Sequence, residues 1–199
     1  MKINFITSNK GKVVTLKKAF KSSGIEIDVE QQTLDIVEPQ ANDVATVSKN
    51  KALQAYKILN EPVVVEDGGF CIDALKGFPG VYTRYILDTI GAEGLLKLMK
   101  NETNRSCKFI SYTTYIDENG ELFQFETDNI ATLSLTDELV KVNCEEAWSD
   151  IWHICKIDEL NKTLAEAKGK DWNNLKAKHN FGRDSITKFV DWFKTKHYS

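Results

Sequence analysis

The sequence has no long apolar run and no excess of basic residues, and each absence excludes a class of protein. Among its 199 residues no stretch is long and apolar enough to span a bilayer, so a membrane-spanning protein is not expected. The apolar run at residues 3–6 is too short for a signal peptide, so we expect a cytoplasmic protein. The formal net charge of −3 gives no basic surplus to attract a nucleic-acid polymer.

Cysteine and histidine are sparse, and neither falls at a metal-ligand spacing. The four cysteines are scattered without a Cys-x-x-Cys pair, so we expect reduced structural thiols rather than a zinc site or a disulfide framework. The three histidines do not form a metal-ligand pattern either. Internal repeats, low-complexity segments and interdomain linkers are also lacking, so we expect residues 1–199 to form one domain.

Strand-like and helix-like segments alternate along the chain, which predicts an α/β fold. The first half predicts a strand at residues 3–6, a helix from Val13 to Gly24, a strand at 25–29, a helix at 42–59 and a strand at 63–65. The expected apolar stripe of the long helix is Val44, Val47, Leu53, Ala55, Tyr56 and Leu59. The second half predicts a helix at 90–99, a hairpin around Asn119-Gly120 with its return strand at 122–125, and an amphipathic helix at 185–193.

Two adjacent carboxylates, Glu66 and Asp67, follow the apolar run at residues 63–65 and precede two glycines. A buried strand that ends in this way delivers acidic groups to the mouth of a cleft. Magnesium takes oxygen ligands, usually one or two carboxylates together with substrate phosphates. The segment therefore suggests a metal site for a phosphorylated substrate, and the alternative is a strand that ends in a solvated acidic turn.

The loop at residues 7–12 joins the first expected strand to the first expected helix. Backbone N–H groups and the helix dipole at such a junction favour an anion. Thr7, Ser8 and Asn9 can donate hydrogen bonds to phosphate oxygens, and Lys12 can supply positive charge. The alternative is an ordinary capped helix start, since the glycine spacing of a P-loop is absent.

Other candidate residues are less specific when taken singly. Glu38 precedes a proline and gains interest only if the fold brings it near the two adjacent carboxylates. Lys51 either extends to the surface or points into a polar cleft toward phosphate. Trp148, Trp152 and Phe181 either stack on a nucleobase or belong to the core.

Together these motifs resemble the inosine triphosphate pyrophosphatase family, which hydrolyses non-standard purine nucleoside triphosphates. The resemblance rests on Thr7-Ser8-Asn9-Lys10-Gly11-Lys12, Glu38-Pro39-Gln40, Lys51-Ala52, and the segments at residues 65–70 and 74–82. It weakens toward the C-terminus: residues 146–152 keep an aromatic at Trp148 but lack the family's glycines and proline. The family's Ser-His-Arg triplet is missing, although His179 and Arg183 lie nearby in the sequence.

The resemblance implies an elongated α/β fold, with a mixed β-sheet, flanking helices and two lobes around a central cleft, assembled as a homodimer. It implies cleavage between the α- and β-phosphates of a nucleoside triphosphate. The implied cofactor is Mg²⁺, with Mn²⁺ as an alternative, held by Glu38 and Asp67 with Glu66 as a further candidate ligand. Asp67 or Glu66 would orient or deprotonate the attacking water.

The resemblance also assigns the remaining contacts to substrate. Phosphate-binding candidates are Thr7, Asn9, Lys12, Lys51 and Arg183, and base-binding candidates are Trp148, Ser149 and Asp150. Because the base-recognition segments have diverged, the preferred base stays open. The competing hypothesis is a nucleotide-binding sensor or regulatory module that has lost turnover.

Overall fold

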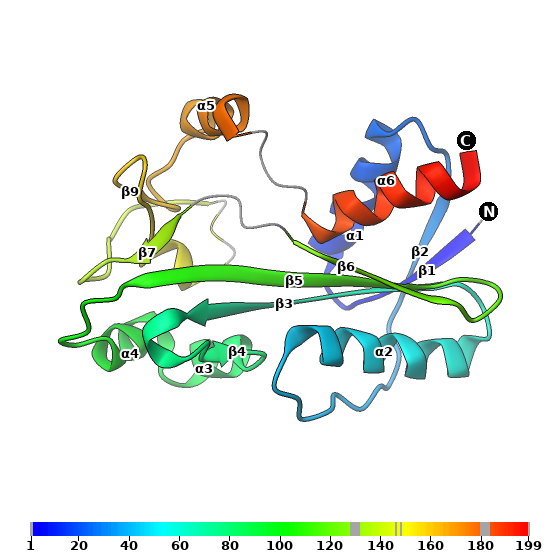
Figure 1. Ribbon diagram of the computed structural model, residues 1–199, viewed down its shortest axis with the longest axis horizontal. Coiled ribbons are helices and arrows are strands. Elements are labelled where there is room, and N and C mark those ends of the chain that lie inside the picture. Colours follow the sequence, from blue (N-terminus) through cyan, green and yellow to red (C-terminus); the bar gives the residue numbers. More distant parts are fainter. Residues whose placement is uncertain (1, 128–131, 146, 148, 180–183, 199) are drawn as a thin grey trace. The chain divides into compact units, whose positions relative to one another are not determined.

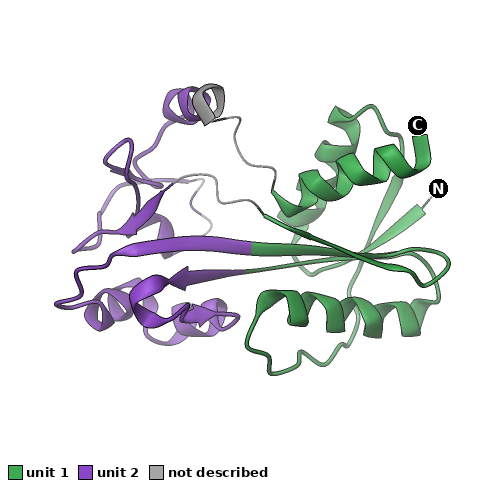
Figure 2. Ribbon diagram, viewed as in Figure 1, with its two compact units in different colours: residues 1–68, 111–128, 183–199 green, residues 69–110, 129–182 purple. Residues whose placement is uncertain are grey.

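The computed structural model describes residues 2–127, 132–145, 147, 149–179 and 184–198, without the side chains of residues 176–179. The fold is mixed α/β, as the sequence predicts, and the chain forms two compact units (Figure 2). Unit 1 comprises residues 1–68, 111–128 and 183–199, and unit 2 comprises residues 69–110 and 129–182. The expectation of a single domain over the whole chain stays a prediction.

Figure 1 labels elements of both units, and two strands of unit 1 also contribute residues to unit 2 (Figure 2). The elements of unit 1 are β1 (Lys2–Ile6), α1 (Lys10–Ser22), β2 (Asp28–Gln32), α2 (Val44–Leu59), β3 (Val63–Ile72), β5 (Ser106–Ile116), β6 (Leu122–Glu126) and α6 (Ser185–Tyr198), of which β3 and β5 are the shared strands. The elements of unit 2 are η1 (Asp73–Leu75), β4 (Pro79–Gly80), α3 (Thr83–Thr89), α4 (Gly91–Leu98), β7 (Leu133–Leu135), η2 (Asp150–His153), β8 (Cys155–Ile157), β9 (Lys162–Thr163) and α5 (Gly169–His179).

The sheet of unit 1 is mixed and is covered on both faces. Strand β1 pairs in parallel with β2 and with β3, β5 lies next to β3, and β6 pairs antiparallel with β5. Helices α1 and α6 pack on one face, over a core that contains Val64 and Tyr115. Helix α2 packs on the other face, over a core that contains Val63, Val65 and Ile116. Successive residues of a strand point to opposite faces, which explains how neighbouring residues of β3 enter different cores.

Several predicted elements are confirmed in this unit. Helix α1 buries the predicted positions Val13, Leu16 and Phe20. Helix α6 buries all four predicted apolar positions, and the hairpin between β5 and β6 turns at Gly120, whose φ is +80°. Glycine adopts this left-handed conformation without the steric cost of a Cβ, which is why Asn-Gly predicts the turn.

Unit 2 is built around an antiparallel series of strands. Strand β5 pairs with β7, β7 with β8, and β8 with β9, while β4 pairs antiparallel with β3. Its apolar core includes Phe70 and Ile72 of β3, Leu95 of α4 and Ile157 of β8. The four cysteines, all of them described, form no disulfide bond with one another. Within the described ranges, every helix is too short or too polar to cross a bilayer.

Three expectations differ from the structure. Strand β2 begins at Asp28 rather than at residue 25, because pairing with β1 starts only at the Lys2–Asp28 register and residues 25–27 precede it. Strand β3 does not end at Val65 but continues to Ile72, since its distal apolar residues are buried in the core of unit 2. Leu53 is 44% exposed, so it lies outside the buried stripe of α2.

The buried hydroxyl of Tyr115 generates a stability prediction. The side chain is fully buried among aromatic rings, and among the described residues its Oη has no hydrogen-bond partner. Burial, with the nearby Glu118 and Asp117 carboxylates, raises the pKa of this phenol, so the hydroxyl is neutral at physiological pH. We expect Tyr115→Phe to leave the free energy of unfolding unchanged within about 1 kcal/mol or to increase it, because an unpaired buried polar atom is removed.

The measurement is urea unfolding, with Tyr115→Ala as the control. Deleting the ring should cost about 3–5 kcal/mol, as for other large buried side chains. If Tyr115→Phe lost about 2 kcal/mol or more, the hydroxyl would have to be hydrogen-bonded in the folded protein.

Candidate functional site

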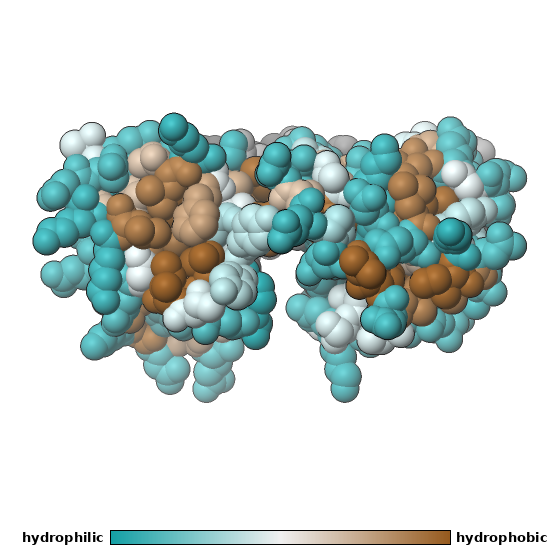
Figure 3. Space-filling view, turned by 90° about the horizontal axis from the view of Figure 1, so that it is seen from below, coloured by the Kyte–Doolittle hydropathy of each residue, from teal (hydrophilic) through white to brown (hydrophobic). Residues whose placement is uncertain are grey.

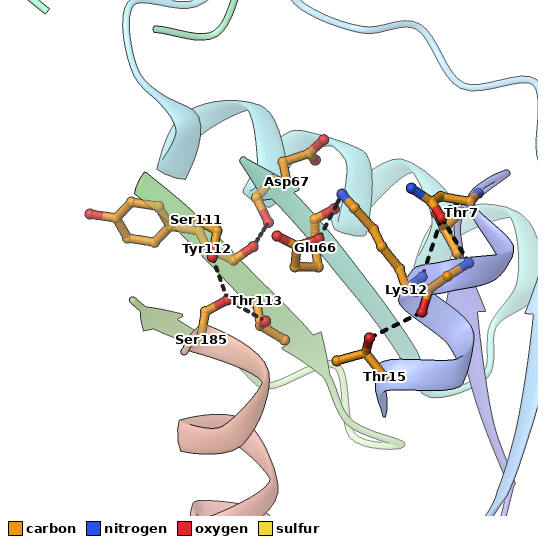
Figure 4. Close-up of polar contacts among 12 residues, drawn as sticks. Thr7, Lys12, Thr15, Glu66, Asp67, Ser111, Tyr112, Thr113 and Ser185 are labelled. Carbon is orange, nitrogen blue, oxygen red and sulfur yellow. Dashed lines mark hydrogen bonds and ion pairs between the residues drawn. The ribbon is translucent and has the colours of Figure 1, made fainter. Parts of the chain in front are cut away.

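The adjacent carboxylates of β3 point to opposite faces of the sheet. Glu66 follows the alternation of Val64 and faces α1, whereas Asp67 follows Val65 and faces α2. Figure 4 shows Glu66 directed toward Lys12 and Asp67 directed away from it. The sequence predicted a strand end that presents both acids together. The structure instead places them in the middle of a continuous strand, which separates them by the normal alternation of side chains.

On the α1 face, Lys12 binds Glu66 at the start of the helix. The Lys12 Nζ lies 2.6 Å from Glu66 Oε2 and donates a hydrogen bond to the Glu66 backbone carbonyl at 2.9 Å. Asn9 caps α1, because its Oδ1 accepts hydrogen bonds from the backbone N–H groups of Gly11 at 2.8 Å and Lys12 at 3.3 Å. Thr7 Oγ1 in turn accepts from the Asn9 N–H at 3.1 Å. The capped helix start is therefore observed, and it brings Thr7, Asn9 and Lys12 into one junction.

On the α2 face, Lys51 joins two of the predicted metal ligands. Its Nζ lies 2.9 Å from Asp67 Oδ1 and 3.1 Å from Glu38 Oε1, so Lys51 does not simply extend into solvent. Burial lowers the pKa of Lys51, but the attraction of Asp67 and its hydrogen bond, with a smaller contribution from Glu38, outweigh this and raise it overall. Lys51 therefore stays charged at neutral pH, between two carboxylates.

Gln54 positions Glu38 and was not recognised in the sequence. Its side-chain Nε2 donates to the Val37 carbonyl at 2.8 Å, and the Val37 N–H donates back to Gln54 Oε1 at 3.1 Å. This reciprocal pair ties the segment before Glu38 to α2, one turn beyond Lys51. The only signal in the sequence is an amide three residues after Lys51 on the same helix, which is too common to stand out.

The α2 face offers oxygen atoms to a cation. Asp67 Oδ2 is buried and has no hydrogen-bond partner among the described residues, whereas Oδ1 is taken by Lys51. Glu38 is 67% exposed on the other side of the same lysine. Across the described ranges, no group of three or more His, Cys, Asp or Glu side chains is arranged to hold a metal ion. Two carboxylates nevertheless fit Mg²⁺, which commonly takes one or two protein carboxylates and completes its shell with phosphates and water.

The predicted base-binding segment belongs to unit 2 and is described in part. Ser149 caps η2, and its Oγ accepts a hydrogen bond from the Ile151 N–H at 3.1 Å. Asp150 is exposed at the first position of η2. Trp148 and Arg183 lie outside the described residues, as does the side chain of His179 at the end of α5.

Comparison with known proteins identifies the sequence pattern. The sequence model of the Ham1 family matches residues 3–134. A dITP/XTP pyrophosphatase of Thermococcus kodakarensis is 38% identical over 197 residues, which cover 98% of this chain and 98% of that protein. A dITP/XTP pyrophosphatase of Methanopyrus kandleri is 42% identical over 125 residues, 63% of this chain. That alignment spans 65% of the relative, slightly less than two thirds of its length.

Solved structures of low sequence identity share the fold. The Ham1 protein of Staphylococcus aureus superimposes with a TM-score of 0.78 at 21% identity, over 98% of this chain and 100% of that one. A HAM1 protein of Coxiella burnetii gives a TM-score of 0.78 at 17% identity, over 98% of each chain. At these identities the likeness establishes the fold alone.

The pairing on the α2 face predicts how the pKa of Lys51 responds to substitution. The folded-state pKa of Lys51 lies above its ordinary value of 10.5. The stabilisation that the pairing gives the fold is therefore fully present below pH 10.5, and it is lost as the pH rises through the folded-state pKa. Asp67→Asn removes the larger of the two attractions, so the pKa of Lys51 should fall. Glu38→Gln should lower it less, because Glu38 is mostly exposed.

Nuclear magnetic resonance of protein labelled with ¹³C-lysine measures this pKa directly through the Lys51 Cε shift. A Lys51 pKa that is unchanged or raised in Asp67→Asn would contradict the pairing.

Proposed function

This chain belongs to the Ham1 family, and we propose that it is a nucleoside triphosphate pyrophosphatase that acts on non-standard nucleotides. The observation that carries the proposal is the group of Lys51, Asp67 and Glu38, in which a buried carboxylate oxygen of Asp67 has no partner among the described residues. These three residues stand at the positions of the motifs that resemble the inosine triphosphate pyrophosphatase family. The relatives named dITP/XTP pyrophosphatase support the same class of substrate, an inosine- or xanthosine-like triphosphate.

The proposed reaction breaks the anhydride bond between the α- and β-phosphates and gives a nucleoside monophosphate and pyrophosphate. Glu38 and Asp67 would hold Mg²⁺, or Mn²⁺ in its place, and the bound ion would neutralise charge on the triphosphate oxygens. Asp67 would also orient or deprotonate the attacking water, since its unpartnered Oδ2 can accept a proton.

The phosphates would be held by groups from two helices. Lys51 on α2 supplies charge beside Asp67, and Lys12 supplies charge at the N-terminus of α1, where the helix dipole also favours an anion. Thr7 and Asn9 belong to the same junction, although the Asn9 carboxamide oxygen is already engaged as the helix cap. Arg183 remains a phosphate-binding candidate on sequence position alone.

A homodimer and a cytoplasmic location complete the proposal. Each unit exposes large apolar side chains, including Leu53 and Ile58 of α2 in unit 1 and Tyr85 and Leu98 of α3 and α4 in unit 2. Brown apolar groups are visible on the surface in Figure 3. Exposed apolar patches commonly mark protein–protein contacts. The cytoplasmic location is proposed from the sequence alone.

The alternative function is a nucleotide-binding module without turnover. The observation that favours it is Lys51, whose ammonium lies between the two carboxylates that would hold the metal. The missing Ser-His-Arg triplet points the same way. This alternative would replace the proposed function if dITP and XTP bound with Mg²⁺ present but released no pyrophosphate.

We expect pyrophosphate release from dITP, ITP or XTP to exceed release from ATP and GTP, and to depend on added Mg²⁺. Chromatography of the products distinguishes the proposed cleavage, which gives monophosphate and pyrophosphate, from γ-phosphate loss, which gives diphosphate and orthophosphate. Asp67→Asn should abolish release, because asparagine keeps the shape but removes the charge that holds the ion.

The matched control is Asp28→Asn, the same chemical change at an exposed residue of β2. It should leave turnover unchanged. Normal Mg²⁺-dependent turnover in Asp67→Asn would refute the assignment of Asp67.

The proposed base contacts give a second substrate test. Trp148 would stack on the base, and Ser149 or Asp150 would meet its polar edge, because this segment stands where the family carries its base-recognition motif. Trp148→Ala and Asp150→Ala should change the ranking of nucleotides, since an unpaired buried polar group costs about 1–3 kcal/mol. If both variants fold and keep the wild-type ranking, base recognition lies elsewhere.

A further inference from the structure

We propose that Glu66 is a positioning residue that holds the Lys12 ammonium ready for the triphosphate, and that it does not bind the metal ion. This inference rests on the proposed function for its substrate. It departs from the interpretation of the sequence, which treated Glu66 and Asp67 as one acidic pair. The two residues are adjacent in the chain but serve different lysines on different faces of the sheet.

Glu66 contacts the Lys12 ammonium through two oxygen atoms. The carboxylate Oε2 lies 2.6 Å from Nζ, and the backbone carbonyl of the same residue accepts a hydrogen bond from Nζ at 2.9 Å. An ammonium group has three N–H donors, so one donor is left for a phosphate oxygen. The Glu66 side chain is only 10% exposed, whereas Lys12 is 32% exposed, so the held ammonium remains accessible.

The other end of Lys12 is fixed by the helix. Lys12 is the third residue of α1, and its backbone N–H donates to the Asn9 cap. Between these ends lies a flexible four-carbon stem, which loses much rotamer freedom when it is held in one geometry. Glu66 imposes that geometry before substrate arrives, so less freedom remains to be lost on binding. Lys12 belongs to the first turn of α1, and the dipole of that helix also favours an anion at its N-terminus.

A metal role for Glu66 fits the geometry poorly. Asp67 and Glu38 share Lys51 on the α2 face, whereas Glu66 lies on the α1 face with its Oε2 bound to Lys12. Residues at consecutive strand positions cannot both turn toward one ion without breaking the pleat of β3. The oxygen without a partner belongs to Asp67, not to Glu66.

The test separates a positioning role from a metal role by measuring three affinities. Calorimetry measures binding of a non-hydrolysable α,β-imido analogue of dITP and of dIMP, and electron paramagnetic resonance measures binding of Mn²⁺. We expect Glu66→Ala to weaken binding of the triphosphate analogue about tenfold and to change dIMP and Mn²⁺ binding less than about twofold. Glu66→Gln should lie in between, because its amide oxygen still accepts a hydrogen bond but lacks the charge.

A double-mutant cycle shows whether Glu66 acts through Lys12. In a Lys12→Met background, Glu66→Ala should cause no further loss of triphosphate affinity. Additive losses would overturn the proposal, and so would a Mn²⁺ affinity reduced about tenfold in both Glu66 variants. The matched control is Glu61→Ala, which removes a carboxylate from another lysine pair of unit 1, Lys2 and Glu61 at 2.8 Å. It should change none of the three affinities.

A last readout does not depend on turnover. In the substrate-free protein, a held Lys12 should show two distinct proton signals at Cε, and these should merge in Glu66→Ala as the side chain becomes mobile. Merged signals in the wild-type protein would overturn the positioning role even if pyrophosphate is released. Two distinct Cε proton signals in a protein that hydrolyses no triphosphate would support the contact between Glu66 and Lys12. That result would refute the proposed function instead.

Discussion

The arrangement of the candidate site depends on the alternation of side chains along β3. A strand that runs without interruption from Val63 to Ile72 must send residues 66 and 67 to opposite faces of the sheet. Different helices cover the two faces, and α1 on one face and α2 on the other each supply one lysine to the carboxylate that they meet. The covering helices α1 and α2 are thereby tied to the same strand by charge as well as by apolar packing.

Partly buried charges of this kind cost desolvation, and the structure offsets that cost by pairing. Glu66 and Asp67 are 10% and 16% exposed, and each contacts a lysine within 3 Å. A buried ion pair adds little stability of its own, but removing one partner leaves the other uncompensated. The two lysine–carboxylate pairs therefore mainly select one arrangement of these side chains, and they add less to the stability of the fold. Gln54 extends the same constraint to Glu38, because it fixes the backbone at Val37 by two hydrogen bonds.

Apolar periodicity and turn residues, which are local patterns, predicted several helices and one hairpin of the fold. Helices α1, α2 and α6 carry clear apolar periodicity, and Asn119-Gly120 is a strong turn signal, so these elements were expected at about their observed positions. The course of β3 was not predictable in the same way, because two acids and two glycines interrupt its apolar pattern. Only the long-range burial of Phe70 and Ile72 explains why the strand continues.

The sequence predicted which residues belong to the candidate site, but not which acid pairs with which lysine. Motif resemblance named Lys12, Glu38, Lys51 and Asp67, and the structure shows which acid meets which lysine. The pairing of a lysine with an acid depends on strand register and on the placement of the helices. The sequence motif specifies neither of these. The sequence model of the family ends its match at residue 134, before the segment proposed to read the base. Recognition of the base is therefore the part on which local sequence gives least guidance.

The charges on the two faces of β3 do not cancel. Two lysines, Lys12 and Lys51, face three carboxylates, so the group as a whole bears a net negative charge. In the proposed function, a bare triphosphate approaching this group would meet charge of its own sign, whereas a triphosphate already complexed with a cation would be much less repelled. If the proposed function holds, the resting ion pairs would select the cation-complexed nucleotide at the entry step, before any role of the cation in the bound state.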